Sequence, residues 1–119
     1  LPEPVIREED DKELGVIFYG SMENTIIEID DILEDSGLSV STCRVRALPL
    51  HPDVENFVRR HKKIIVLEIN RDGQLFGIIR KEFPADLLMK IHSVAYSDGM
   101  PPRARVYSEM ILEVLKEVV

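Results

Sequence analysis

The chain has 119 residues, 45% of them hydrophobic, and a formal net charge of −7 at pH 7. This size suits one domain, and the negative charge argues against nucleic acid as the main partner because phosphate binding needs a basic face. Its single cysteine, Cys43, excludes a disulfide framework and a cysteine-rich zinc site, and suits a cytoplasmic protein. No apolar run approaches the roughly 20 residues that cross a bilayer, so no membrane partner is expected.

The first 13 residues are polar and acidic, and they contain two prolines. This composition is typical of a connection between domains, so residues 1–13 are expected to form a linker or an N-terminal extension. Residues 14–119 are expected to form a single α/β domain.

A continuous apolar run at residues 14–19 predicts a strand that is buried on both faces. Gly20 ends this run, and Ser21 is the expected N-cap of the helix that follows. That helix carries isoleucines and a leucine at helical spacing, with acidic residues on its other face. Gly37 is its expected C-terminal stop.

The next strand is expected at residues 39–47, and Pro52 marks the first turn of a second helix. That helix ends in a basic run, which complements the negative end of the helix dipole. Residues 64–69 give the clearest prediction of a buried strand because they are β-branched or aliphatic except for Glu68. A turn follows, and the next helix is expected at residues 74–83, closed by Pro84.

A further strand is expected at residues 89–95, with Ile91 and Val94 as its apolar members. Turn residues at 98–102 precede a C-terminal helix from about residue 104. The apolar face of this helix is expected to consist of Val106, Met110, Ile111, Val114, Leu115 and Val118. Strands that alternate with helices predict right-handed crossovers and a mostly parallel sheet covered by helices on both faces.

Ligands of open parallel sheets bind beyond the C-terminal ends of the strands. Three loops are predicted at that edge, and the residues that they offer as an interface or ligand edge are Gly20, Ser21, His51, Asn70, Gly73 and Gln74. The first loop opens a helix and is either a plain cap or an anion site. The loop at residues 70–74 is either a well-made strand-to-helix turn or a docking surface, and both interpretations need the same backbone geometry.

Catalytic residues are not predicted anywhere in the chain. His51, His61 and His92 are scattered and lack the spacing of a metal site or an obvious nucleophile to activate. Cys43 lies inside a predicted strand, where an inert buried thiol is expected. The carboxylates fall mostly on predicted wet helix faces.

Five segments of the chain, taken in order, resemble the alpha subunits of 2-oxoacid:ferredoxin oxidoreductases. The segment after the third strand matches their E-x-N-x-x-G-Q-L pattern, and the others match an earlier strand ending in Gly-Ser, a proline-bearing loop, an apolar-apolar-Arg step and a late D-G-x-P turn. The matching segments are GVIFYGS at 15–21, LPLHP at 48–52, EINRDGQL at 68–75, IIR at 78–80 and DGMP at 98–101.

The resemblance implies the C-terminal domain of that subunit, similar to the C-terminal domain of transketolase, with a three-layer α/β/α sandwich and one antiparallel strand. That family oxidatively decarboxylates 2-oxoacids to acyl-CoA. The parent complex is expected to use thiamine diphosphate, magnesium and iron–sulfur clusters, with none bound by this domain. The implied partners are the N-terminal domain of the same subunit, the beta subunit and, through the complex, ferredoxin, in an oligomer.

This chain carries no G-D-G…N-type motif for thiamine diphosphate and magnesium, and one cysteine cannot ligate a four-cysteine cluster. The expected role is therefore assembly or interface formation without a complete active site. The alternative is a regulatory α/β module that binds a nucleotide or coenzyme A. An independent enzyme is the weakest of the three hypotheses because no nucleophile–base pair is evident.

Overall fold

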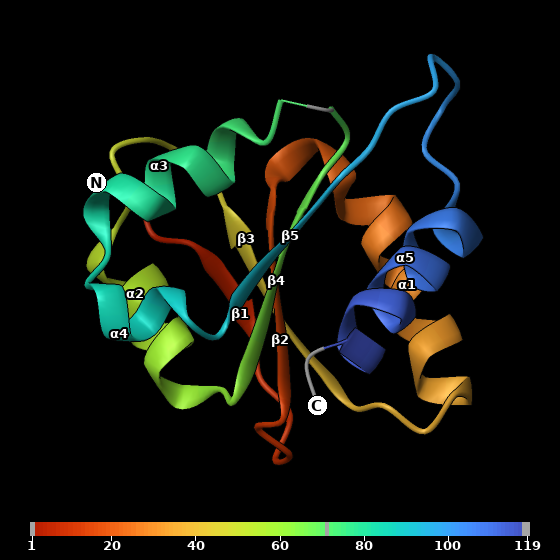
Figure 1. Ribbon diagram of the computed structural model, residues 1–119, viewed down its shortest axis with the longest axis horizontal. Coiled ribbons are helices and arrows are strands. Elements are labelled where there is room, and N and C mark those ends of the chain that lie inside the picture. Colours follow the sequence, from red (N-terminus) through yellow and green to blue (C-terminus); the bar gives the residue numbers. More distant parts are fainter. Residues whose placement is uncertain (1, 71, 118–119) are drawn as a thin grey trace.

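The computed structural model describes residues 2–70 and 72–117 and shows a three-layer α/β/α arrangement (Figure 1). Within these residues the sheet has five strands in the order β1-β3-β2-β4-β5. The strands are β1 (Val5–Arg7), β2 (Leu14–Tyr19), β3 (Val40–Val45), β4 (Lys63–Glu68) and β5 (Ile91–Ala95). Arg71 in the third loop and Val118 of the expected helix face lie outside the described residues.

Strands β2 to β5 are parallel, as the alternation of strands and helices predicted. Ile17 of β2 sits at the centre, paired with Cys43 of β3 on one side and Val66 of β4 on the other. Consecutive strand residues point to opposite faces, so β2 supplies Val16 to one core and Ile17 to the other. Burial on both faces explains the continuous apolar run that predicted this strand.

Helices cover both faces of the sheet (Figure 1). On one face α1 (Glu23–Asp35) packs beside α5 (Ala104–Glu117). On the other lie α2 (Pro52–Arg60), α3 (Gln74–Glu82) and the short α4 (Ala85–Leu88), which the sequence did not predict. No helix in the described part of the chain has the length and apolarity that crossing a membrane requires.

The antiparallel strand β1 arises from the segment expected to be a linker or N-terminal extension. Val5–Arg7 pairs with β3, placing Ile6 opposite Cys43, and Ile6 packs against the α2–α3 core. Its exposed–intermediate–exposed burial explains why three residues in an acidic segment gave no strand signal. These residues belong to the sheet, whereas a connection from residues 1–13 to another domain stays a prediction.

Helix α1 does not begin as predicted. Gly20–Met22 forms a 3-10 turn, and Met22 stands at the N-cap of α1 with no side-chain hydrogen bond, so the expected cap by Ser21 is wrong. At the other end Gly37 has a φ of +86° and its N–H donates to the carbonyl of Glu34, as expected for a helix stop.

The buried stripe of α5 matches the predicted one in part, because Ile111 is buried and Met110, Val114 and Leu115 pack partly buried against the core. The buried residues are Ala104, Tyr107, Ser108 and Ile111, while Val106 and Met110 are half-buried. Ser108 is accommodated because its hydroxyl donates to the carbonyl of Ala104 at 2.8 Å. Because this stripe includes polar residues, the apolar pattern of the sequence did not fully indicate its position.

Candidate ligand and contact edge of the sheet

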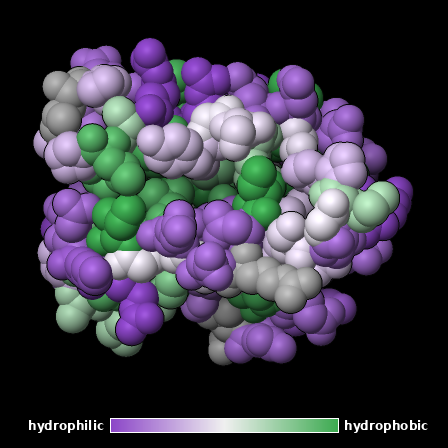
Figure 2. All heavy atoms as spheres, turned by 90° about the horizontal axis from the view of Figure 1, so that it is seen from above, coloured by the Kyte–Doolittle hydropathy of each residue, from purple (hydrophilic) through white to green (hydrophobic). Residues whose placement is uncertain are grey.

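The C-terminal ends of β2 and β4 border an open pocket of about 380 Å³. Figure 2 views the molecule from this edge and shows a hollow with hydrophobic residues at its floor and hydrophilic residues around it. The lining residues come from the ends of both strands, from the loops after β2, β3 and β4, and from the start of α3. The pocket therefore lies where parallel sheets place their ligands.

Glu68, the last residue of β4, organises the loop into α3. Its carboxylate accepts the N–H of Leu75 at 2.7 Å and the N–H of Phe76 at 3.3 Å, and the residue is 6% exposed. It satisfies two of the amides that a helix start leaves without intrahelical partners. In the sequence Glu68 stands out only as part of a motif, and its role as a cap was not predicted.

Asn70 and Gly73 complete the same turn. The Asn70 Oδ1 accepts the N–H groups of Asp72 at 3.1 Å and Gly73 at 3.2 Å. Gly73 is the N-cap residue of α3 and has a left-handed φ of +61°, which glycine adopts without steric penalty. The well-made turn that the sequence predicted is therefore present.

The start of α3 is not free to hold an anionic ligand, whereas the anion site considered from the sequence is the loop at Gly20 and Ser21, where it stays a prediction. The Glu68 carboxylate already accepts two of its amides and brings a negative charge to the place where a phosphate would sit. A second anion there would meet like-charge repulsion in a partly buried setting.

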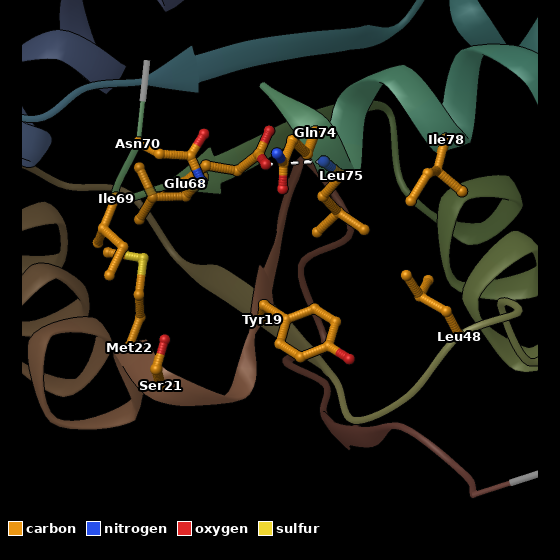
Figure 3. Close-up of a pocket in the computed structure, with 11 residues that line it drawn as sticks. Tyr19, Ser21, Met22, Leu48, Glu68, Ile69, Asn70, Gln74, Leu75 and Ile78 are labelled. Carbon is orange, nitrogen blue, oxygen red and sulfur yellow. Dashed lines mark hydrogen bonds between the residues drawn. The ribbon is translucent and has the colours of Figure 1, made fainter. Parts of the chain in front are cut away.

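Polar side chains around the pocket keep free hydrogen-bonding groups. Within residues 2–70 and 72–117, the side chains of Tyr19, Ser21 and Gln74 make no hydrogen bond. Figure 3 shows these side chains around the open space, with Leu48 and Ile78 on one side and Met22 with Ile69 on the other. The structure thus gathers Ser21, Asn70 and Gln74 from the predicted edge, with Gly73 adjacent.

His51 belongs to the same edge but does not line the pocket. Its Nδ1 accepts the N–H of Asp53 at 3.0 Å, so the imidazole caps α2 directly before Pro52. Gly20 lies in the 3-10 turn before α1 and also lies outside the pocket lining. A contact role for these two residues stays a prediction.

The remaining histidines and the cysteine lie apart from the pocket. His61 is 1% exposed, stacks near Phe57, and its Nδ1 lies 2.7 Å from the Phe57 carbonyl, to which it donates. His92 stands on β5. Cys43 is fully buried in β3, and burial raises the pKa of its thiol to about 12. Such a thiol is a packing residue.

The groups that the resemblance implies for the parent complex do not fit the described residues of this chain. Among the described residues no cluster of three or more His, Cys, Asp or Glu side chains could hold a metal ion. The one cysteine of the sequence cannot supply the thiolates of an iron–sulfur cluster. The pocket also lacks a described cationic side chain that would meet a diphosphate. No catalytic step can be assigned to these residues.

No family model and no curated protein sequence matches the chain. Solved structures do match. A 2-oxoglutarate:ferredoxin oxidoreductase from Magnetococcus marinus aligns with 99% of this chain at 28% identity and a TM-score of 0.74. That structure contains 2-oxoglutarate, coenzyme A and succinyl-CoA, and this chain spans only 20% of its length.

Two more distant structures share the fold. The alpha chain of a probable 2-oxoacid ferredoxin oxidoreductase from Thermoplasma acidophilum aligns with 96% of this chain and 97% of its own length, at 15% identity and a TM-score of 0.56. A split-gene transketolase, an inactive beta4 tetramer, aligns with 90% of this chain and 39% of its own, at 16% identity and a TM-score of 0.64. The chain thus has the transketolase C-terminal-like α/β fold, and its resemblance to the 2-oxoacid:ferredoxin oxidoreductases is confirmed.

Proposed function

We propose that this chain is the C-terminal domain of the alpha subunit of a thiamine-dependent 2-oxoacid:ferredoxin oxidoreductase. The observation that carries the proposal is the alignment of 99% of the chain with a 2-oxoglutarate:ferredoxin oxidoreductase at a TM-score of 0.74. The five ordered sequence segments support the same assignment. The parent reaction would be the oxidative decarboxylation of a 2-oxoacid to acyl-CoA, with electrons passed to ferredoxin.

The role of this domain in that reaction is assembly. Its partners would be the N-terminal domain of the same subunit and the beta subunit, in an oligomeric cytoplasmic complex. Thiamine diphosphate, magnesium and iron–sulfur clusters would supply the reaction chemistry from those other parts. The pocket edge is suited to a contact surface because Tyr19 and Leu48 are 41% and 46% exposed there.

The strand-to-helix turn gives this contact surface a fixed shape. The Glu68 cap and the Asn70 turn hold the backbone of Asp72, Gly73, Leu75 and Phe76 through four hydrogen bonds. Gln74 therefore projects from an ordered helix start, with its amide unpaired within the described residues. Because the backbone that carries Gln74 is already ordered, this loop loses little backbone entropy on binding.

The proposal is tested on the complete reading frame that contains this chain, co-expressed with the neighbouring subunit gene. The purified complex is expected to reduce ferredoxin when given a 2-oxoacid, coenzyme A and thiamine diphosphate. Chain 1–119 purified alone is the matched control and is expected to reduce none. A reading frame without a thiamine-enzyme domain, or turnover by the isolated chain, would contradict the proposal.

The alternative, a module that binds a nucleotide or coenzyme A, retains one supporting observation, which is the pocket at the ligand edge of the sheet. The Glu68 carboxylate at the α3 start weighs against it because both ligands are anionic. Calorimetric titration of the chain with coenzyme A and with ATP separates the two functions, since only the alternative predicts binding heat.

A further inference from the structure

The pocket at the C-terminal edge of the sheet has a charge that does not suit a phosphate or a carboxylate. Glu68 is the only charged side chain among the described residues that line it. The other described residues of its wall are apolar or neutral, with Met22, Leu75 and Ile78 at its sides (Figure 3). A ligand of matching chemistry therefore has an apolar body and no negative charge.

The Glu68 carboxylate can accept further hydrogen bonds from such a ligand. It accepts two backbone N–H groups, whereas an ionised carboxylate has about four acceptor positions. Its two oxygens lie at the pocket wall in Figure 3. Donors that suit the remaining positions are N–H groups, and a cationic N–H gains additional Coulomb attraction.

Neutral polar groups stand at the pocket rim. The Tyr19 hydroxyl and the Gln74 amide have no hydrogen-bond partner within residues 2–70 and 72–117, and both border the pocket. Each can donate or accept, so they can bind the polar end of a ligand without adding charge. The volume of about 380 Å³ suits a molecule the size of one substituted aromatic ring.

We infer that this pocket is a binding site for a small organic molecule with an aromatic or aliphatic body and a neutral or cationic nitrogen donor. The donor pairs with Glu68, the body packs between Met22 and Ile78, and Tyr19 lines the entrance. The site rejects carboxylates and phosphates. This inference does not depend on the proposed enzyme, because it uses only the geometry and charge of the pocket.

Three probes of nearly the same shape test the charge preference on chain 1–119. Benzamidine is cationic, benzamide is neutral and benzoate is anionic. Titrations followed by amide chemical shifts are expected to show shifts at Gln74 and Leu75 with benzamidine and benzamide. Dissociation constants of about 1 mM are expected for probes this small. Benzoate is expected to bind at least about tenfold more weakly.

Two pocket variants and one control locate the interaction. Glu68→Gln keeps an acceptor for the Leu75 N–H and removes the charge, so it should abolish the discrimination between benzamidine and benzoate. Tyr19→Ala changes an exposed side chain and should weaken both nitrogen probes about three- to tenfold without unfolding the chain. Met89→Ala, at an 83% exposed residue outside the pocket lining, should leave all three titrations unchanged.

Several results would overturn the inference. One is the absence of saturable shifts with benzamidine and benzamide at probe concentrations about ten times the expected constant. Another is equal binding of benzoate to the native chain. Shifts that persist unchanged in Tyr19→Ala would place the probes elsewhere, and this would overturn it even if Glu68→Gln failed to fold.

Discussion

At the scale of single residues, two glycines of the α3 region have different backbone environments, so alanine is expected to have opposite effects on stability at the two positions. Gly73 has a φ of +61°, while Gly77 lies inside α3 with open space around the position of an added Cβ. Gly73→Ala is expected to lower the free energy of unfolding by about 1 kcal/mol, because alanine disfavours the left-handed region. Gly77→Ala is the matched control and should raise it by about 0.5–1 kcal/mol through helix propensity.

Urea unfolding of both glycine variants measures these changes. An added Cβ at Gly73 would lie 3.7 Å from the Glu68 Oε2, which is ordinary contact, so the expected loss is conformational and not a clash. Equal stability of Gly73→Ala and the native chain would show that the turn does not hold the described conformation.

His61 makes the fold sensitive to acid. Its Nε2 is buried without a hydrogen-bond partner among the described atoms, and burial lowers the pKa of this imidazole below 6.5. The charged groups that act on it are Glu8, which favours the protonated form, and Lys12 and Arg60, which oppose it. The unfolded chain binds the proton more readily. The contribution of His61 to the free energy of unfolding is therefore fully present above pH 6.5 and is lost as pH falls below that value.

The variant His61→Phe keeps an aromatic ring beside Phe57 and removes the titrating group. We expect its unfolding free energy to decline less than that of the native chain between pH 7 and pH 5. At neutral pH it should lose about 1 kcal/mol, because the Phe57 carbonyl loses its imidazole donor. His92 also has a pKa lowered by burial, so His92→Phe serves as the comparison. Parallel pH profiles for the native chain and His61→Phe would contradict the prediction.

At the scale of elements, the sequence predicted the central strands β2 and β4 most clearly, because they are buried on both faces and their interior residues are apolar. It also placed α2, because Pro52 and the basic C-terminal run are local signals. It missed α4 and β1, which are short and take their order from long-range contacts. No local sequence pattern predicted the cap formed by Glu68 either, because it joins a strand end to a helix start seven residues away.

Strand β1 tests whether the N-terminal segment is part of the folded domain. Ile6 packs against the α2–α3 core, whereas its neighbour Val5 is 39% exposed. Ile6→Asp is expected to lower the free energy of unfolding by about 1–3 kcal/mol, because it places a charge against apolar side chains. Val5→Asp should change it by less than about 0.5 kcal/mol. Denaturant titration compares the two, and equal effects would mean that β1 is not docked on β3.

At the scale of the whole molecule, the close packing of the sheet on its helices could not be foreseen from local patterns. Gly15 in β2 shows this, since a Cβ there would lie 2.7 Å from the Phe57 ring of α2. Local sequence patterns predict the strand of Gly15 and the helix that contains Phe57, but they carry no signal for this close approach. The edge of the sheet was predictable because the carboxyl ends of parallel strands converge, whereas the shape and charge of the pocket depend on side-chain packing.

Substitution of the exposed side chains at the pocket edge can separate an effect on assembly from an effect on stability. Tyr19 and Leu48 are partly exposed, so their joint replacement by alanine removes little buried area from the isolated chain. The double variant should keep the unfolding free energy within about 1 kcal/mol of the native value. If the pocket edge contacts the rest of the parent enzyme, the same variant should weaken subunit association in the complete complex at least about tenfold.

The double variant Ile27→Ala/Met89→Ala provides the control for that comparison. These residues are 48% and 83% exposed and do not line the pocket. Sedimentation of the co-expressed complex over a dilution series reports association for each variant. Loss of association only in Tyr19→Ala/Leu48→Ala would support the pocket edge as the contact surface. Native-like association of that variant would exclude a major contribution of these two side chains, because residues at the centre of an interface contribute most to binding.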